Sequence, residues 1–255
     1  MLSGFRLDGR IALVTGAGAG LGEAVAYALA EAGAQSVLVG RNGAPLEALA
    51  ARIAAAGLPP ALVRPCDVLD TPRIQAIIAA LPTLDILVNN AGTNIPEPFV
   101  EVSEQHLDAI LNLNTRAYFL VAQAAARKML EDPGRRARGG AIINMSSQMG
   151  HIGSPNRTVY CMSKHAVEGL TKAMAVELAP QHIRVNSIGP TFVETPLVQR
   201  VVDTPEKRHF VMSRIPMGEM AQLADIAGAA VFLASPAAAM ITGAALLVDG
   251  GWTAQ

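Results

Sequence analysis

The sequence predicts an α/β fold: one parallel sheet covered by helices on both faces. Short β-branched runs alternate with longer amphipathic stretches along all 255 residues. The short runs are apolar almost throughout, as is typical of strands buried on both faces. Since crossovers between parallel strands are right-handed, a doubly wound sheet is expected. No linker, repeat or low-complexity tract divides the chain, so we expect a single domain over residues 1–255.

The elements follow one another in regular order, from a first buried strand at 11–15 to a last one that runs into Asp249-Gly250-Gly251. A segment rich in Pro and Thr, about 189–218, lacks strand patterning and is expected to be the substrate loop. We expect about seven strands, at 11–15, 36–40, 61–65, 84–88, 141–145, 183–187 and 245–248. Helices are expected at 21–32, 44–56, 71–80, 103–130, 158–179 and 223–234.

Charge and composition exclude several classes of partner. The net charge is −1, which leaves no electrostatic footprint for nucleic acid or an anionic membrane. The basic run at 135–138 is interpreted as a solvated loop. The N-terminus has no signal-peptide pattern, and no 18-residue apolar span escapes charge, Gly or Pro. A cytoplasmic protein without membrane contact is therefore expected.

The two cysteines, Cys66 and Cys161, are too few for a disulfide framework, and no metal-ligand spacing exists. Cys66 ends an apolar run and is interpreted as a core thiol. Cys161 follows Tyr160, and its helical position is expected to turn it away from the site. We therefore expect no metal.

A glycine-rich turn, Thr15-Gly-Ala-Gly-Ala-Gly-Leu-Gly22, joins the first strand to the first helix. It departs from the literal G-x-G-x-x-G pattern. Glycines still permit a tight turn and bring backbone N–H groups at a helix N-terminus close to a pyrophosphate. The turn is therefore a candidate dinucleotide site, with a flexible strand–helix connection as the alternative.

The end of the second strand, Gly40-Arg41-Asn42, carries no acid that would bind a ribose 2′-hydroxyl. Arg41 is able to form charge-assisted hydrogen bonds to a 2′-phosphate, worth about 1.5–3 kcal/mol. We therefore expect NADP(H) to be preferred over NAD(H) by roughly ten- to a hundredfold.

The chemistry is predicted by Tyr160 and Lys164, which lie on one face of a helix because they are spaced i,i+4. An ammonium near a phenol favours the phenolate and lowers its pKa from about 10. Ser147, thirteen residues upstream, is positioned to hold a carbonyl or alcohol oxygen. Alone, the Tyr-x3-Lys spacing is weak evidence.

Taken in order, these motifs resemble the classical short-chain dehydrogenase/reductases over essentially the whole chain. The resemblance rests on Thr15-Gly16-x3-Gly20-x-Gly22, Asp67-Val68, Asn89-Asn90-Ala91-Gly92, Asn114, Ser147 and Tyr160-x3-Lys164. It implies a Rossmann fold. One departure is Gly189-Pro190-Thr191, where Thr191 replaces a usual glycine, so the backbone detail there is open.

The resemblance implies roles for the catalytic residues. Tyr160 exchanges the proton, and Lys164 binds the nicotinamide ribose and lowers the Tyr160 pKa. Ser147, rather than Ser146, positions the substrate oxygen, and Asn114 bends its helix and holds a water that links Lys164 to solvent. The alternative is that Lys164 is a helix-surface lysine, Tyr160 a buried phenol and Asn114 a polar helix residue, none of them with a catalytic role.

The resemblance also implies the cofactor contacts. Asp67 accepts from the adenine amino group, Val68 offers its N–H, and Asn90 and Gly92 approach the adenosine ribose, while Asn89 ties strands together. The residues expected to bind the cofactor are Gly16, Gly18, Ala19, Gly20, Leu21, Gly22, Arg41, Asn42, Asp67, Val68, Asn90, Ala91, Gly92, Tyr160, Lys164, Pro190, Val193 and Thr195.

The substrate contacts are less determined. Ser147, Met149, Tyr160 and Phe192 are the expected ones, while Asn94, Phe99, Leu197 and Val198 serve equally as pocket wall or as packing. His151 is interpreted either as a pocket residue or as a solvated loop residue. The end of the chain at Trp252 resembles a family segment that packs at a tetramer interface, so a homotetramer is expected.

We therefore expect an NADP(H)-dependent enzyme that interconverts a ketone and a secondary alcohol by hydride transfer, with a small-molecule substrate. Two enzyme alternatives are a 3-oxoacyl-[acyl-carrier-protein] reductase and an NAD-dependent polyol- or gluconate-type dehydrogenase. The first would need a basic docking patch, for which Arg135, Arg136 and Arg138 are a thin candidate. A non-catalytic nucleotide-binding protein is a remote alternative.

Overall fold

The computed structural model describes residues 3–195, 198 and 202–255. Its seven strands are β1 (Ile11–Thr15), β2 (Gln35–Gly40), β3 (Leu62–Pro65), β4 (Ile86–Asn89), β5 (Gly140–Met145), β6 (Ile183–Pro190) and β7 (Ala245–Val248). Its helices are α1 (Gly20–Glu31), α2 (Gly43–Ala55), α3 (Thr71–Ala79), α4 (Glu104–Leu111), α5 (Ala117–Leu130), α6 (Arg135–Arg138), α7 (Thr158–Leu178), α9 (Pro205–Met212) and α10 (Leu223–Ala234).

All seven strands are parallel and follow the order β3-β2-β1-β4-β5-β6-β7. From β1 the chain adds strands outward to β3 on one side, and from β4 it adds strands outward to β7 on the other side. The strand order therefore reverses between β1 and β4, which is the switch point of the sheet. A crevice opens there at the carboxyl ends of the strands, the usual ligand position in doubly wound sheets. The predicted fold class is confirmed.

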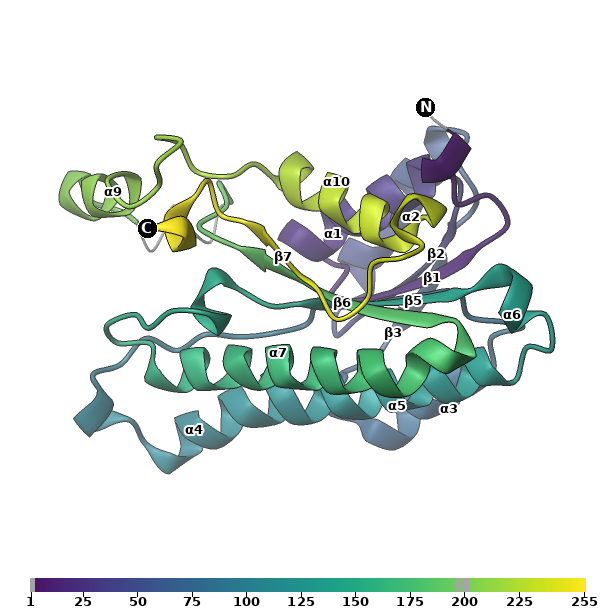
Figure 1. Cartoon of the computed structure of the whole chain (residues 1–255), viewed down its shortest axis with the longest axis horizontal. Helices are drawn as coiled ribbons and strands as arrows, with labels where there is room; N and C mark the ends of the chain where they lie inside the picture. The colour runs from purple at the N-terminus through teal and green to yellow at the C-terminus, as the bar shows by residue number, and fades with distance from the viewer. Residues whose placement is uncertain (1–2, 196–197, 199–201) are drawn as a thin grey trace.

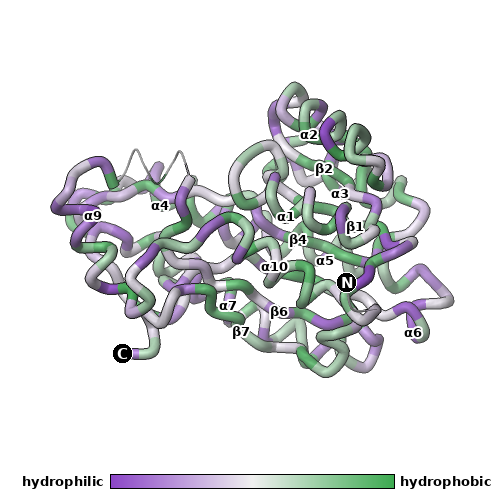
Figure 2. Tube along the Cα trace, turned by 90° about the horizontal axis from the view of Figure 1, so that it is seen from above, coloured by the Kyte–Doolittle hydropathy of each residue, from purple (hydrophilic) through white to green (hydrophobic). Residues whose placement is uncertain are grey.

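The sheet separates two hydrophobic cores, because successive strand side chains point to opposite faces. Ala12 and Val14 pack with α1, α2 and α10, whereas Ile11 and Leu13 pack with α3, α5 and α7. Figure 1 shows these two helical layers above and below the sheet. In Figure 2 the central strands are hydrophobic, while α6 and α9 are largely hydrophilic.

Two expected segments differ in the structure. The single helix expected at 103–130 is interrupted by a π-helical turn at Asn112–Arg116, which separates α4 from α5. The expected loop at 189–218 carries helix α9, whose N-cap Thr204 accepts a hydrogen bond from the Lys207 N–H and whose first residue is Pro205. Within the part of the chain that is described, no helix has the length and apolar character needed to cross a membrane.

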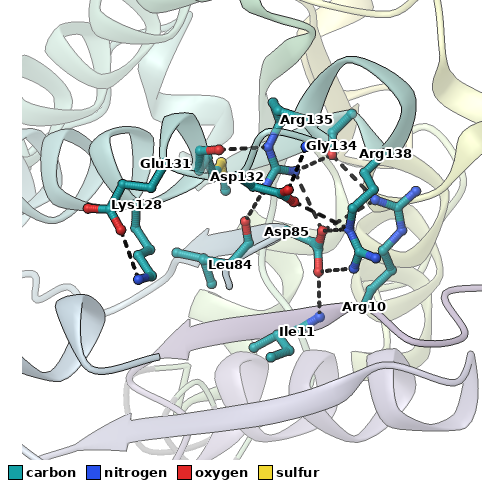
Figure 3. A network of polar contacts seen from close by, with 12 residues as sticks. Arg10, Ile11, Leu84, Asp85, Lys128, Glu131, Asp132, Gly134, Arg135 and Arg138 are labelled. Carbon is teal, nitrogen blue, oxygen red and sulfur yellow. Dashed lines mark hydrogen bonds and ion pairs between the residues drawn. The ribbon is translucent and has the colours of Figure 1, made fainter. Parts of the chain in front are cut away.

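At the amino ends of the strands, the 1% exposed side chain of Asp85 lies among three arginines (Figure 3). Arg138 donates to both carboxylate oxygens at 3.0 and 2.9 Å, and the Ile11 N–H donates at 2.9 Å. Arg10 Nη1 lies 3.3 Å and Arg135 Nη1 3.5 Å from Oδ1. Burial alone raises the pKa of Asp85, but these donors lower it overall.

The prediction that 135–138 is a solvated loop is therefore wrong for Arg135, which is 5% exposed. Its guanidinium also donates to the carbonyls of Met129 and Leu84 at 2.9 and 2.7 Å. Two of the three arginines considered as a carrier-protein docking patch are thus engaged within the fold.

Candidate active site

A cavity of about 1090 Å³ follows the carboxyl ends of the strands from the glycine turn to Tyr160. It joins the nucleotide and catalytic segments that the sequence analysis singled out separately. The expected site residues on its wall are Gly16, Ala19, Gly20, Leu21, Arg41, Asp67, Val68, Asn90, Ala91, Gly92, Ser147, Met149, Tyr160, Phe192, Val193 and Thr195. The expected site residues that are not on the wall are Gly18, Gly22, Asn42, Asn114, Lys164 and Pro190.

The glycine turn leaves the N-terminus of α1 open to the cavity. Ala19 is the N-cap and offers no side-chain acceptor, so first-turn N–H groups stay free for a ligand. Gly16 and Gly20 have φ values of 67° and 58°, which favour glycine. A Cβ at Gly22 would lie 2.2 Å from the Gly16 carbonyl oxygen, so this glycine serves close packing inside the turn.

The adenosine-side residues divide into wall and support. Arg41 is exposed on the wall at the end of β2. Asp67 accepts from the Leu69 N–H at 3.0 Å and keeps the loop after β3 turned towards the cavity. The Asn90 side chain donates to the Thr15 carbonyl at 3.0 Å and its N–H donates to Thr15 Oγ1 at 2.9 Å, so both groups hold the end of β1 rather than meet a ligand.

Asn89 lies behind this end of the cavity. Its side chain donates to the Tyr118 carbonyl at 3.1 Å and to Asn144 Oδ1 at 3.2 Å, and thereby joins β4 to α5 and β5. The contacts agree with the expected tying role.

Ser147 and Tyr160 share the cavity wall, and Ser146 is absent from it. Ser147 follows β5 in an extended conformation and is 8% exposed, and its Oγ accepts from the Met149 N–H at 3.1 Å. Burial raises the pKa of Tyr160, while its hydrogen bond with Ser147 and the Arg157 charge act to lower it. The geometry favours Ser147 over Ser146 as the group that meets a substrate oxygen.

Lys164 lies behind Tyr160 and is 3% exposed. Its Nζ donates to the Met145 carbonyl at 2.8 Å and sits 5.6 Å from the centroid of the Tyr160 ring. Burial lowers the pKa of Lys164 to about 7, opposed by the charge of Glu168. The expected net lowering of the Tyr160 pKa is not found, because burial of the phenol dominates and the ammonium is directed at Met145.

Asn114 lies in the π-helical turn and is fully buried. Its amide exchanges two 2.8 Å hydrogen bonds with the backbone of Thr93 and donates to Ser163 Oγ at 3.2 Å. It thereby fixes the loop after β4 against α7, one residue before Lys164. A π turn at a buried polar residue is often found at functional sites. The water link to Lys164 stays a prediction.

The far end of the cavity is mostly apolar. Phe192 stacks on Trp252 with ring centroids 5.9 Å apart, and Met149 and Val198 complete the wall. Phe99, expected as wall or packing, is 73% exposed. Leu197, expected in the same role, lies outside the described residues.

His151 is turned towards α7, where its Nε2 lies 3.5 Å from Glu168 Oε1, and it is not on the cavity wall. Cys161 is likewise off the wall, as expected.

Sequence reasoning missed five polar residues of the wall: Glu23, Thr93, Gln148, Arg157 and Thr191. The Gln148 amide and the Thr191 hydroxyl are buried and have no hydrogen-bond partner within the described residues. Arg157 is the N-cap of α7, three residues before Tyr160. Its position one helical turn from the tyrosine was the available signal. Such orphaned polar atoms suit a cavity built for a polar ligand.

Comparison with known proteins gives consistent matches over nearly the whole chain. A family model described as "Enoyl-(Acyl carrier protein) reductase" matches residues 16–253. The chain is 43% identical to D-threitol dehydrogenase of Mycolicibacterium smegmatis, over 98% of this chain and 95% of that protein. It is 39% identical to L-xylulose reductase of Bos taurus, over 98% of both.

Among solved structures, the chain is similar to a gluconate 5-dehydrogenase from Burkholderia cenocepacia in complex with NADP and tartrate. The TM-score is 0.92 at 37% identity, with 99% of this chain and 98% of that chain covered.

Proposed function

The chain belongs to the classical short-chain dehydrogenase/reductase family, and on that premise we propose that it interconverts a secondary alcohol and a ketone on a polyol, a sugar or a sugar acid, with NADP(H). The observation that carries the proposal is the single cavity whose wall holds the glycine turn at one end and Ser147 with Tyr160 at the other. The relatives described above are named for a polyol, D-threitol, a ketose, L-xylulose, and a sugar acid, gluconate.

The residues of the cavity fit a dinucleotide. The open N-terminus of α1 offers free N–H groups to a pyrophosphate, and the positive φ angles of Gly16 and Gly20 let the backbone come close. At the other end, the Thr191 hydroxyl, which has no hydrogen-bond partner among the described residues, suits the nicotinamide amide or a ribose. NADP(H), when bound, supplies or accepts the hydride at the carbinol carbon.

Tyr160 is the proposed general acid and base. In oxidation, its phenolate takes the proton of the alcohol hydroxyl while the carbinol hydride leaves, and a ketone results. In reduction, its hydroxyl returns that proton to the oxygen. Ser147 holds the oxygen within reach of Tyr160, since both hydroxyls border the same part of the cavity.

Lys164 is proposed to supply positive charge behind the phenol. Because burial lowers its pKa to about 7, this charge depends on pH near neutrality. Asn114 is a positioning residue in this scheme, because it holds the loop after β4 against the helix that carries Lys164.

Arg41 is proposed to select NADP(H) over NAD(H), which remains the weaker cofactor. It lies on the wall at the end of β2, where an acid would repel a 2′-phosphate and none is present.

The substitution Tyr160→Phe tests the catalytic assignment. It removes the exchanging proton and keeps the ring, so kcat with NADP⁺ and D-threitol or another accepted polyol should fall by roughly 10²–10⁴-fold. The Kd of NADPH, measured by its fluorescence, should change little.

Tyr27→Phe is the matched control. Tyr27 lies on α1, where its ring packs under Arg52 of α2, and it is not on the cavity wall. Turnover by the Tyr160→Phe variant at the level of this control would refute the assignment.

A further inference from the structure

Arg157 brings a positive charge to the catalytic end of the cavity. It is the N-cap of α7, so it lies one helical turn before Tyr160. Its side chain is half-buried on the wall of the cavity that Ser147, Gln148 and Tyr160 also line. The Arg157 charge acts on the Tyr160 phenol, which also indicates that the two groups are close.

This guanidinium has no carboxylate partner among the described residues. Its one hydrogen bond there is weak, to the carbonyl of its neighbour Asn156 at 3.4 Å. Burial lowers the pKa of Arg157, and the opposing charges come from Tyr160 and Cys161. The nearby loop carboxylate of Glu97 is occupied by His106 Nδ1 at 2.7 Å. The positions outside the described ranges hold no Asp or Glu.

The charged groups of the cavity wall are distributed unevenly. Glu23 lies on α1, and Arg41 and Asp67 follow β2 and β3. All three are on the β3-β2-β1 side of the reversal between β1 and β4, where the adenosine is expected. Ser147 and Thr191 follow β5 and β6, on the other side. Among the described wall residues on that side, Arg157 is the one charged group.

A half-buried, unpartnered guanidinium loses hydration without compensation. A carboxylate restores it best, because two parallel N–H···O bonds match the planar fork. A phosphate monoester would carry up to two charges against this single cation. The tartrate in the similar gluconate 5-dehydrogenase is itself a polyhydroxy carboxylate.

We propose that Arg157 binds the carboxylate of the substrate, so that this enzyme acts on a sugar acid, an aldonate or its keto form, in preference to a neutral polyol or ketose. The inference rests on the proposed function and narrows its substrate class. Arg157 would orient the chain of the sugar acid while Ser147 and Tyr160 meet the reacting hydroxyl.

Matched substrates test this inference. D-gluconate and D-glucitol share a carbon skeleton and differ at C1, as do D-threonate and D-threitol. With NADP⁺ and the wild-type enzyme, kcat/KM should be at least about tenfold higher for the acid in at least one pair. Arg157→Gln should lower the acid-to-alditol ratio of kcat/KM by roughly ten- to a hundredfold, mainly through KM. Arg157→Lys should recover part of the ratio.

Arg136→Gln is the matched control, because Arg136 is exposed on α6 at the opposite edge of the sheet, and its ratio should equal that of the wild type. A wild type that prefers the alditol in both pairs, or a ratio unaltered by Arg157→Gln, would overturn the inference while leaving the proposed function intact.

Calorimetric titration of D-gluconate and D-threonate into the enzyme–NADPH complex separates the two proposals. Binding that Arg157→Gln abolishes supports the inference even without turnover, whereas absence of turnover with all four substrates counts against the proposed function. If neither acid binds the wild-type complex, the carboxylate assignment is refuted.

Discussion

Arginines lie at both ends of the parallel strands, and their surroundings differ. We call the side of the sheet where the strands begin the amino edge and the side where they end the carboxyl edge. At the amino edge, Arg10, Arg135 and Arg138 surround the buried Asp85 and also bind backbone carbonyls. At the carboxyl edge, Arg157 faces the cavity and meets no carboxylate of the described residues. The charges of the first three arginines are neutralised within the fold, whereas Arg157 is available to bind an anionic ligand.

The presence or absence of a carboxylate partner within the fold therefore distinguishes arginines that stabilise the fold from an arginine that is available to bind a ligand. A buried ion pair becomes costly when one partner is removed, because the other charge is left uncompensated. An unpaired charge at a cavity is already in that condition, so its removal costs little stability and much binding.

The largest effect is expected at Asp85. Asp85→Asn keeps the shape but leaves three guanidinium groups without their shared anion, so the free energy of unfolding should fall by about 3–5 kcal/mol in urea titrations. Asp108→Asn, at an exposed position of α4, should stay within about 0.5 kcal/mol of the wild type. Equal stability of the two variants would show that the amino edge does not depend on this ion cluster.

Arg41 is the next test, as a second arginine of the carboxyl edge. Arg41→Gln should lower the NADPH-to-NADH ratio of kcat/KM by roughly ten- to a hundredfold, because it removes charge-assisted hydrogen bonds to the 2′-phosphate. Steady-state kinetics with both cofactors measures the ratio. A wild-type preference for NADH would mean that Arg41 is only a surface residue.

Lys164 extends the comparison to a buried cation near the cavity. Its pKa of about 7 lies below the roughly 10.4 of an unfolded lysine, so between these pH values the unfolded chain binds a proton that the folded chain lacks. Stability relative to Lys164→Met should therefore rise by roughly 2 kcal/mol from pH 7 to pH 9 in the cofactor-free protein. Urea titrations at both pH values measure this change, and a flat difference would contradict the lowered pKa.

The smallest effect on stability is expected at Arg157. Arg157→Leu removes a half-buried charge with no carboxylate partner among the described residues, so the free energy of unfolding should be unchanged or rise by up to about 1 kcal/mol. Urea titration of the cofactor-free protein tests this. A loss comparable to that of Asp85→Asn would mean that Arg157 is held by internal contacts, like the arginines of the amino edge.

Most of the fold could be predicted from local pattern. Apolar runs marked the strands, and β1 begins and ends at the predicted residues. The sequence also carried the signals of α9, Thr204 before Pro205 and Glu206, which were overlooked in a segment without strand patterning. The break at Asn112–Arg116 could not be placed by periodicity, because the π turn depends on Asn114 bonding to Thr93 and Ser163.

The site was harder to predict than the fold where it depends on the direction in which a side chain points, because sequence spacing gives only the helix face. The i,i+4 spacing brought Tyr160 and Lys164 to one helix face, but it did not reveal that the Met145 carbonyl takes the ammonium. The basic run gave no sign of Asp85, which lies 50 residues before Arg135 in the sequence. Arg157 was overlooked for the same reason, since a charge at a helix start resembles a solvated cap until the cavity is known.

Arg157, which meets no carboxylate among the described residues, is proposed to bind the carboxylate of the substrate. Thermal unfolding of the NADPH complex with and without D-gluconate tests this claim most directly, with D-glucitol as the neutral control. We predict that D-gluconate raises the Tm of the wild type more than D-glucitol does, and that this excess is lost in Arg157→Gln. Equal shifts for the two compounds in the wild type, or an excess retained in Arg157→Gln, would contradict the claim.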